Sequence, residues 1–109
     1  MSEALCRLDD IPDPGGKSFI LEQDGKPLKV LVIRQGARVF GWVNSCPHIH
    51  RPLNWGDTPF LDLFKTSIVC ANHFALFEMD SGLCTRGPCI GKKLAPFPVR
   101  VVDGAVWRV

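Results

Sequence analysis

The sequence predicts an all-β fold, an antiparallel sandwich or small barrel formed by a single domain of 109 residues. Two observations indicate this fold class. Short apolar stretches alternate with Gly-containing turns along most of the chain, and helical spacing of apolar residues is hard to find. The composition, 46% hydrophobic and 22% charged residues, is that of an ordinary globular protein. A series of short strands joined by tight turns is typical of antiparallel sheets.

The first half of the chain contains three predicted strands in succession. Residues 17–22 and 27–34 flank a segment with Asp24-Gly25, and Asp-Gly is the strongest short hairpin signal. A third strand over 38–43 follows a turn at Gln35-Gly36. Neighbouring strands of this series are expected to pair antiparallel.

The second half contains two further predicted pairs of strands. Their ranges are 66–70 with 75–78, and 97–102 with 105–109. The turn Met79-Asp80-Ser81-Gly82 follows the first pair, and the second pair closes around Asp103-Gly104.

Two irregular stretches interrupt this pattern, residues 45–63 and residues 82–96. The first is rich in Pro, Trp, His and Asn, and the second contains Gly87-Pro88. Long segments without regular structure inside a compact domain are usually functional. Residues of the kinds that bind metals lie at the edges of both stretches.

Two short motifs combine a cysteine with a histidine, Cys46-Pro47-His48 and Cys70-Ala71-Asn72-His73. A tight loop can turn a thiolate and an imidazole toward one metal. In an extended strand, the side chains of residues i and i+2 point the same way but those of residues i and i+3 point apart. The two motifs therefore cannot both be strands facing one site. The sequence therefore predicts a metal centre held by two loops. A structural zinc site is an alternative, although zinc sites usually keep their two cysteines together and their two histidines together.

The spacing C-x-H followed by C-x-x-H resembles the ligand pattern of Rieske proteins, in which two histidines replace two cysteines on one iron. Residues 77–82 look like the Phe–acid–Ser/Thr-Gly turn of that family, Gly87-Pro88 is similar to its proline loop, and 94–102 to the strand that follows. The resemblance covers nearly the whole chain. It implies one Rieske-type antiparallel β-sandwich or barrel over residues 1–109, with a cluster-binding subdomain of two loops at approximately 44–94.

The resemblance also implies the cofactor, one 2Fe–2S cluster. Cys46 and Cys70 would hold one iron, and His48 and His73 would hold the other. Two Fe³⁺, two S²⁻ and two thiolates sum to zero charge when both imidazoles are neutral, so an electron is added more easily than to a four-cysteine cluster. No catalytic residue is expected, because the remaining histidine, His50, cannot complete a 2-His-1-carboxylate iron site.

The implied function is that of a Rieske-type ferredoxin, a one-electron carrier and not an enzyme. Its partners would be a reductase that donates the electron and an acceptor such as an oxygenase. A second hypothesis is a small redox subunit of a larger enzyme, such as a nitrite reductase. Some members of that group look like Rieske domains with lost ligands, whereas all four ligands are present here. A zinc-stabilised binding domain is the third hypothesis, and such a protein would be colourless.

Charge and hydropathy argue against other partners. The net charge of +2 is too weak to indicate binding to nucleic acid or to an anionic membrane. No apolar run approaches the ~20 residues that cross a bilayer, and the N-terminal residues 1–10 have no signal-peptide pattern. We therefore expect a cytoplasmic protein. In a reducing compartment its five cysteines are ligands or thiols, and a disulfide between Cys84 and Cys89 is possible but disfavoured.

The departures from the high-potential members of the family predict a low reduction potential. Those members have a disulfide between the two loops, where this chain has Arg51 and Asn72, and a Ser near the second His, where it has Ala75. This chain also contains no Tyr. With fewer hydrogen-bond donors the reduced cluster is stabilised less, so the midpoint should lie near the lower end of the ~−150 to +300 mV Rieske range. A spectroelectrochemical titration that gives a clearly positive midpoint would contradict this prediction.

Overall fold

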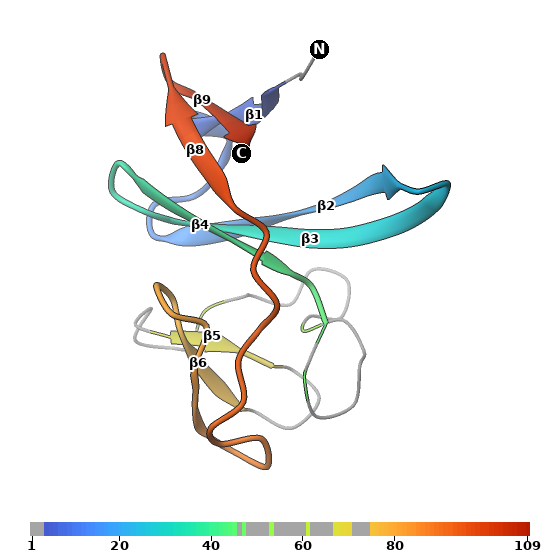
Figure 1. Cartoon of the computed structure of the whole chain (residues 1–109). Coiled ribbons are helices and arrows are strands. Elements are labelled where there is room, and N and C mark those ends of the chain that lie inside the picture. Colours follow the sequence, from blue (N-terminus) through green and yellow to red (C-terminus); the bar gives the residue numbers. More distant parts are fainter. Residues whose placement is uncertain (1–3, 46, 48–52, 54–60, 62–66, 71–74) are drawn as a thin grey trace.

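The computed structural model describes residues 4–45, 47, 53, 61, 67–70 and 75–109 (Figure 1). In these residues the chain forms three antiparallel sheets of three strands each. The terminal sheet, in the order β1-β9-β8, contains β1 (Ala4–Arg7), β8 (Val99–Val102) and β9 (Ala105–Arg108). The central sheet contains β2 (Gly15–Gln23), β3 (Lys26–Gln35) and β4 (Arg38–Val43), and the third sheet contains β5 (Ser67–Val69), β6 (Leu76–Glu78) and β7 (Cys84–Arg86). A short 3-10 helix, η1 (Leu8–Asp10), follows β1.

The all-β antiparallel prediction is confirmed. The central sheet contains the three strands expected in the first half, and the predicted turn at Asp24-Gly25 joins β2 to β3, with both residues at positive φ. Two strands were not predicted, β1 and β7. Each is three or four residues long, and β1 pairs with β9 at the other end of the sequence, so no local pattern marks it.

Strand β3 contains the longest run of fully buried residues in the described part of the chain, Val30 to Ile33. Alternation along the strand directs Val32 into one buried cluster, with Val106 of the terminal sheet and Ile11. It directs Leu31 and Ile33 into the other cluster, with Phe77 of the third sheet. An uninterrupted apolar run is what a strand needs when both of its faces are covered. Each of these side chains contributes about 1.5–3 kcal/mol by leaving water.

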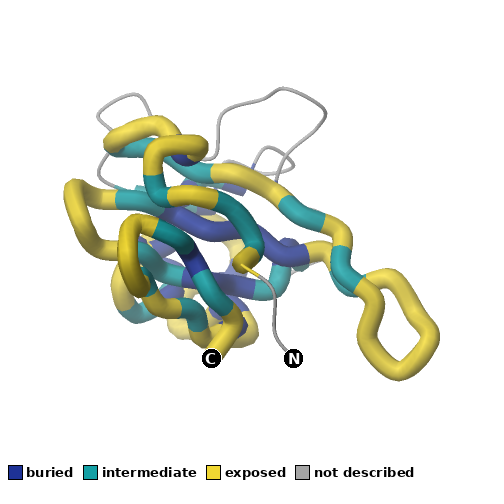
Figure 2. Tube along the Cα trace, turned by 90° about the horizontal axis from the view of Figure 1, so that it is seen from above, coloured by how far each residue is buried: buried dark blue, intermediate teal, exposed yellow. Residues whose placement is uncertain are grey.

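The sheets form three layers, with the terminal sheet above the central sheet and the third sheet below it in Figure 1. Buried residues gather along the middle of the molecule, whereas the tip of the β2–β3 hairpin extends away from it and is exposed (Figure 2). This hairpin tip therefore takes little part in either buried cluster.

The segment between β7 and β8 ties the lower layers together. The Val43 backbone N–H donates to the Ala95 carbonyl at 2.8 Å, and the Phe97 N–H donates to the Gly41 carbonyl at 3.0 Å. The Trp42 indole Nε1–H donates to the Met79 carbonyl at 3.2 Å, in a buried position. The first two bonds hold residues 95–97 against β4, and the third holds the turn after β6, and with it the third sheet, against the same strand.

Among the described residues no helix is long and apolar enough to span a membrane.

Gly41 is a test of this attachment. A Cβ at Gly41 would overlap the carbonyl oxygen of Phe97 and crowd Val99. We expect Gly41→Ala to destabilise the protein by about 3 kcal/mol, because backbone must move to relieve the overlap. The matched control is Gly36→Ala, since Gly36 has open space around its Cα and only its φ of +63° opposes a side chain. That change should cost about 1 kcal/mol. Urea unfolding measures both, and equal losses would contradict the prediction.

Candidate metal centre

Cys70 lies where the strand pair β5–β6 opens into a loop. Its backbone N–H donates to the Ala75 carbonyl at 2.9 Å, directly beyond the last registered pair, Val69 with Leu76. Cys70 and Ala75 are both fully buried. The second cysteine–histidine motif, residues 70–73, therefore begins at a loop base closed by a backbone hydrogen bond.

A side chain closes the first loop in the same way. Asn44 follows β4 and is buried, and its Oδ1 accepts a hydrogen bond from the Leu53 backbone N–H at 2.8 Å. Leu53 itself is fully buried. Because residues 44 and 53 are held together, the first motif, residues 46–48, belongs to a segment whose two ends are fixed. Asn44 was not among the predicted site residues, although a polar residue between an apolar strand and the Cys46 motif is a signal for such a role.

The two loop bases belong to one buried cluster. Leu53 from the first loop and Cys70 and Ala75 from the second are members of the same cluster, together with Leu94. One buried cluster therefore supports the described bases of both loops, as expected for two motifs on one scaffold.

The predicted proline loop packs on the second base. Gly87 has φ +100°, and a Cβ there would lie 2.8 Å from the Ala75 Cα and 2.9 Å from its Cβ. Glycine is required here both by conformation and by the close approach. The segment around Gly87 therefore packs on Ala75, at the base of the Cys70 loop.

Of the four predicted ligands the structure describes Cys70. Cys46, His48 and His73 lie outside the described residues, as do His50, Arg51 and Asn72. Within the described part of the chain no three His, Cys, Asp or Glu side chains are grouped so that they could hold a metal. The convergence of the four ligands therefore stays a prediction.

The surroundings of Cys70 fit the implied cluster. The other members of its buried cluster are apolar or thiol-bearing side chains, and among the described residues the one buried polar side chain is Asn44. A charged metal group in such a place would lack compensating charge and would be expensive to bury. Two thiolates and two neutral imidazoles on two ferric irons and two sulfides give a neutral centre, which avoids that cost.

Comparison with known proteins agrees with this architecture. The family model of the Rieske [2Fe-2S] domain matches residues 2–101. The ferredoxin of carbazole 1,9a-dioxygenase from Nocardioides aromaticivorans IC177 is similar with a TM-score of 0.77 and 23% identity, over 100% of this chain and 97% of that chain. The ferredoxin in a complex of reduced oxygenase and oxidized ferredoxin of carbazole 1,9a-dioxygenase is similar with a TM-score of 0.76 and 22% identity, over 99% of this chain and 92% of that chain.

A third similar structure is a putative nitrite reductase NADPH (small subunit) oxidoreductase protein, with a TM-score of 0.71 and 19% identity, over 100% of this chain and 98% of that chain. At these identities the likeness shows the fold. A search of curated proteins found no significant match.

The hydrogen bond from Leu53 to Asn44 can be tested by its removal. Asn44→Ala leaves the Leu53 N–H buried without its acceptor, and we expect a loss of about 1–3 kcal/mol of unfolding free energy. The control is Asp10→Ala, which removes a similar bond, from the Arg7 N–H to the Asp10 Oδ2 at 3.0 Å, in an exposed position. Water can replace that bond, so the control should lose about 0.5 kcal/mol. Chemical denaturation of both variants measures the difference, and a loss no larger for Asn44→Ala would contradict it.

Proposed function

The chain belongs to the Rieske [2Fe-2S] domain family, and on that premise we propose that it is a one-electron carrier that acts as a ferredoxin. The observation that carries the proposal is the position of Cys70. Its buried side chain lies at a closed loop base that shares one apolar cluster with the base of the other loop. A neutral redox centre between two such loops suits the transfer of single electrons.

We assign the cluster to four ligands. Cys46 and Cys70 would hold one iron, and His48 and His73 the other, within a cluster-binding subdomain at approximately 44–94 of a single domain over residues 1–109. When bound, the cluster takes up one electron and gives it back.

The described residues supply the environment for this chemistry. Leu53, Ala75 and Leu94 keep water from the protein side of Cys70. The hydrogen bonds from Cys70 to Ala75 and from Leu53 to Asn44 hold the loop bases, so the Cys70 thiolate moves little between redox states. A small movement of ligands favours rapid electron transfer.

The similar ferredoxins support redox proteins as partners. One of them is in a complex with an oxygenase, so a reductase as donor and an oxygenase as acceptor are the partners we propose, in the cytoplasm. The likeness to the putative nitrite reductase small subunit keeps a second candidate, a redox subunit of a larger enzyme. A freestanding carrier purifies alone, whereas a subunit co-purifies with a large chain.

The experiment that tests the function is spectroscopic and kinetic. The purified protein should be brown-red, and its dithionite-reduced form should give an EPR spectrum with a lower average g than that of a four-cysteine cluster. The reduced protein should then pass one electron per chain to cytochrome c. A colourless protein that contains zinc in place of iron would refute the proposal.

A pair of cysteine variants tests the ligand assignment. The wild-type protein should contain about two iron atoms and two sulfides per chain. We expect Cys70→Ser to lose most of both, because a hydroxyl is a poor substitute for a thiolate ligand. Cys6→Ser is the control, because Cys6 lies on β1 and packs against the other buried cluster. This variant should keep the full iron content. Iron and acid-labile sulfide analysis measures both, and full iron content in Cys70→Ser would contradict the assignment.

A further inference from the structure

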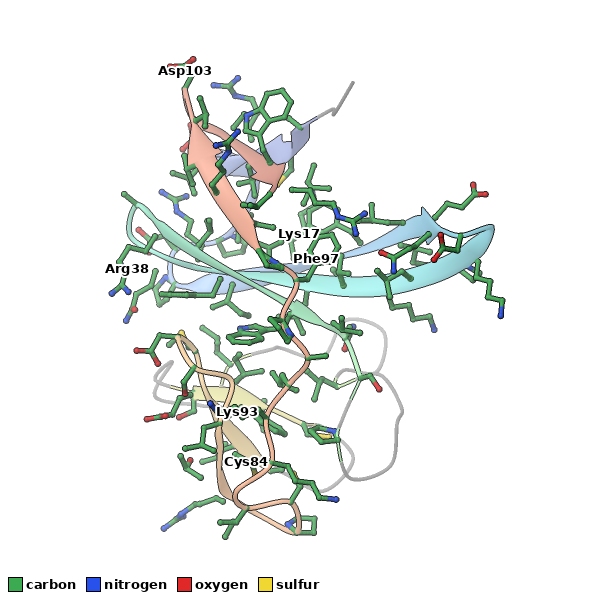
Figure 3. The ribbon with its side chains drawn as sticks, in the orientation of Figure 1. Lys17, Arg38, Cys84, Lys93, Phe97 and Asp103 are labelled. Carbon is green, nitrogen blue, oxygen red and sulfur yellow. The ribbon has the colours of Figure 1, made fainter. Side chains whose placement is uncertain are left out.

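Two cysteines outside the proposed ligand set lie in contact with each other. The Cys89 thiol donates a hydrogen bond to the Cys84 sulfur, with the two Sγ atoms 3.3 Å apart. Both side chains are almost fully buried. Cys84 begins β7 and is labelled in the lower part of Figure 3. Cys89 follows the Gly87-Pro88 turn. The two are not joined by a disulfide in this structure.

The backbone holds these two cysteines in a short closed ring. The Cys84 N–H donates to the Lys92 carbonyl at 2.8 Å, and the Lys92 N–H donates to the Cys89 carbonyl at 2.9 Å. The Gly91 N–H donates to the Cys84 carbonyl at 3.2 Å. A disulfide has an S–S distance near 2.05 Å, so the sulfurs need to approach by only about 1 Å. The existing backbone bonds can be kept during so small a movement.

We propose that Cys84 and Cys89 form a redox-active dithiol that an anionic low-molecular-weight disulfide, of the glutathione disulfide class, oxidises to an intramolecular disulfide. The thiolate of one cysteine attacks a sulfur of the oxidant and releases one thiolate, which takes up a proton. The second cysteine, deprotonated in turn, attacks the mixed disulfide and releases the other thiolate, which is also protonated. Two cysteine thiols thus become one disulfide, and the oxidant disulfide becomes two thiols.

The charge around the pair suits an anionic oxidant. Residues 84–93 include three basic side chains, Arg86, Lys92 and Lys93, and no acidic one. All three basic residues are exposed. A local excess of positive charge raises the concentration of an anion beside the loop. Since the sulfurs are buried, reaction requires the segment to open, which makes the exchange slow and its equilibrium the quantity to measure.

The disulfide would act on the second loop base. Gly87 lies inside the ring closed by Cys84 and Cys89, and it contacts Ala75, whose carbonyl accepts the Cys70 hydrogen bond. Oxidation therefore restrains the segment that packs against the base of the Cys70 loop. Reduction releases that restraint.

Cys6 provides a control within the same chain. It is partly buried on β1, in the cluster of the terminal sheet, and burial raises the pKa of its thiol above the ordinary value. Lys17 opposes this shift and Asp10 adds to it. Less thiolate makes Cys6 a slower reaction partner.

The experiment equilibrates the iron-loaded protein, without oxygen, in buffers of increasing glutathione disulfide to glutathione ratio. Remaining thiols are alkylated in denaturant, and intact mass and tryptic peptides are read by mass spectrometry. Trypsin cleaves after Arg86, so Cys84 and Cys89 fall on separate peptides that only a disulfide can join. Fragment ions distinguish Cys84 from Cys70, which share residues 66–86, and iron is measured in parallel.

We expect the protein to carry two fewer alkyl groups as the ratio rises, with the Cys84 peptide joined to the Cys89 peptide. Cys6→Ser should behave in the same way, whereas Cys84→Ser and Cys89→Ala should form no such link. The proposal is overturned if the wild-type pair stays reduced at the most oxidising ratio, stops at a mixed disulfide with glutathione, or links through Cys70 or Cys6. The thiol masses are read independently of EPR and electron transfer, so this result and the proposed carrier function can fail separately.

Discussion

Strand β3 runs between two layers, and the burial of both its faces is the constraint on which the rest of the structure depends. Val32 faces the terminal sheet, while Leu31 and Ile33 face the third sheet and the loop bases. Each outer layer buries its apolar side chains by packing on this strand. The chain termini meet in β1 and β9 for the same reason, since together with β8 they cover one face.

The other face supports the candidate metal centre through hydrogen bonds that are themselves buried. Cys70 and Ala75 close one loop with backbone groups, and Asn44 closes the other with its side-chain oxygen. Neither bond competes with water, so each holds its loop more firmly than an exposed bond would.

Gly87 and the Cys84–Cys89 pair together shape the segment that packs on the base of the Cys70 loop. Gly87 approaches Ala75 more closely than any side chain would permit, and the Cys84–Cys89 pair closes the ring that contains Gly87. The cysteines that do not belong to the proposed ligand set are therefore not equivalent. Cys6 is a partly buried packing residue in the terminal sheet, whereas Cys84 and Cys89 form a contact pair beside the second loop.

The fold class, the central hairpin at Asp24-Gly25 and the family could be predicted from the amino-acid sequence, because alternation, turn chemistry and the spacing of Cys46, His48, Cys70 and His73 can be read along the chain. The pairing of β1 with β9, the hydrogen bond from Leu53 to Asn44 and the contact of the Cys84 and Cys89 sulfurs depend on tertiary packing. These contacts join segments whose partners are chosen by packing around β3. A pattern read along the chain holds no information about which buried groups packing will bring together.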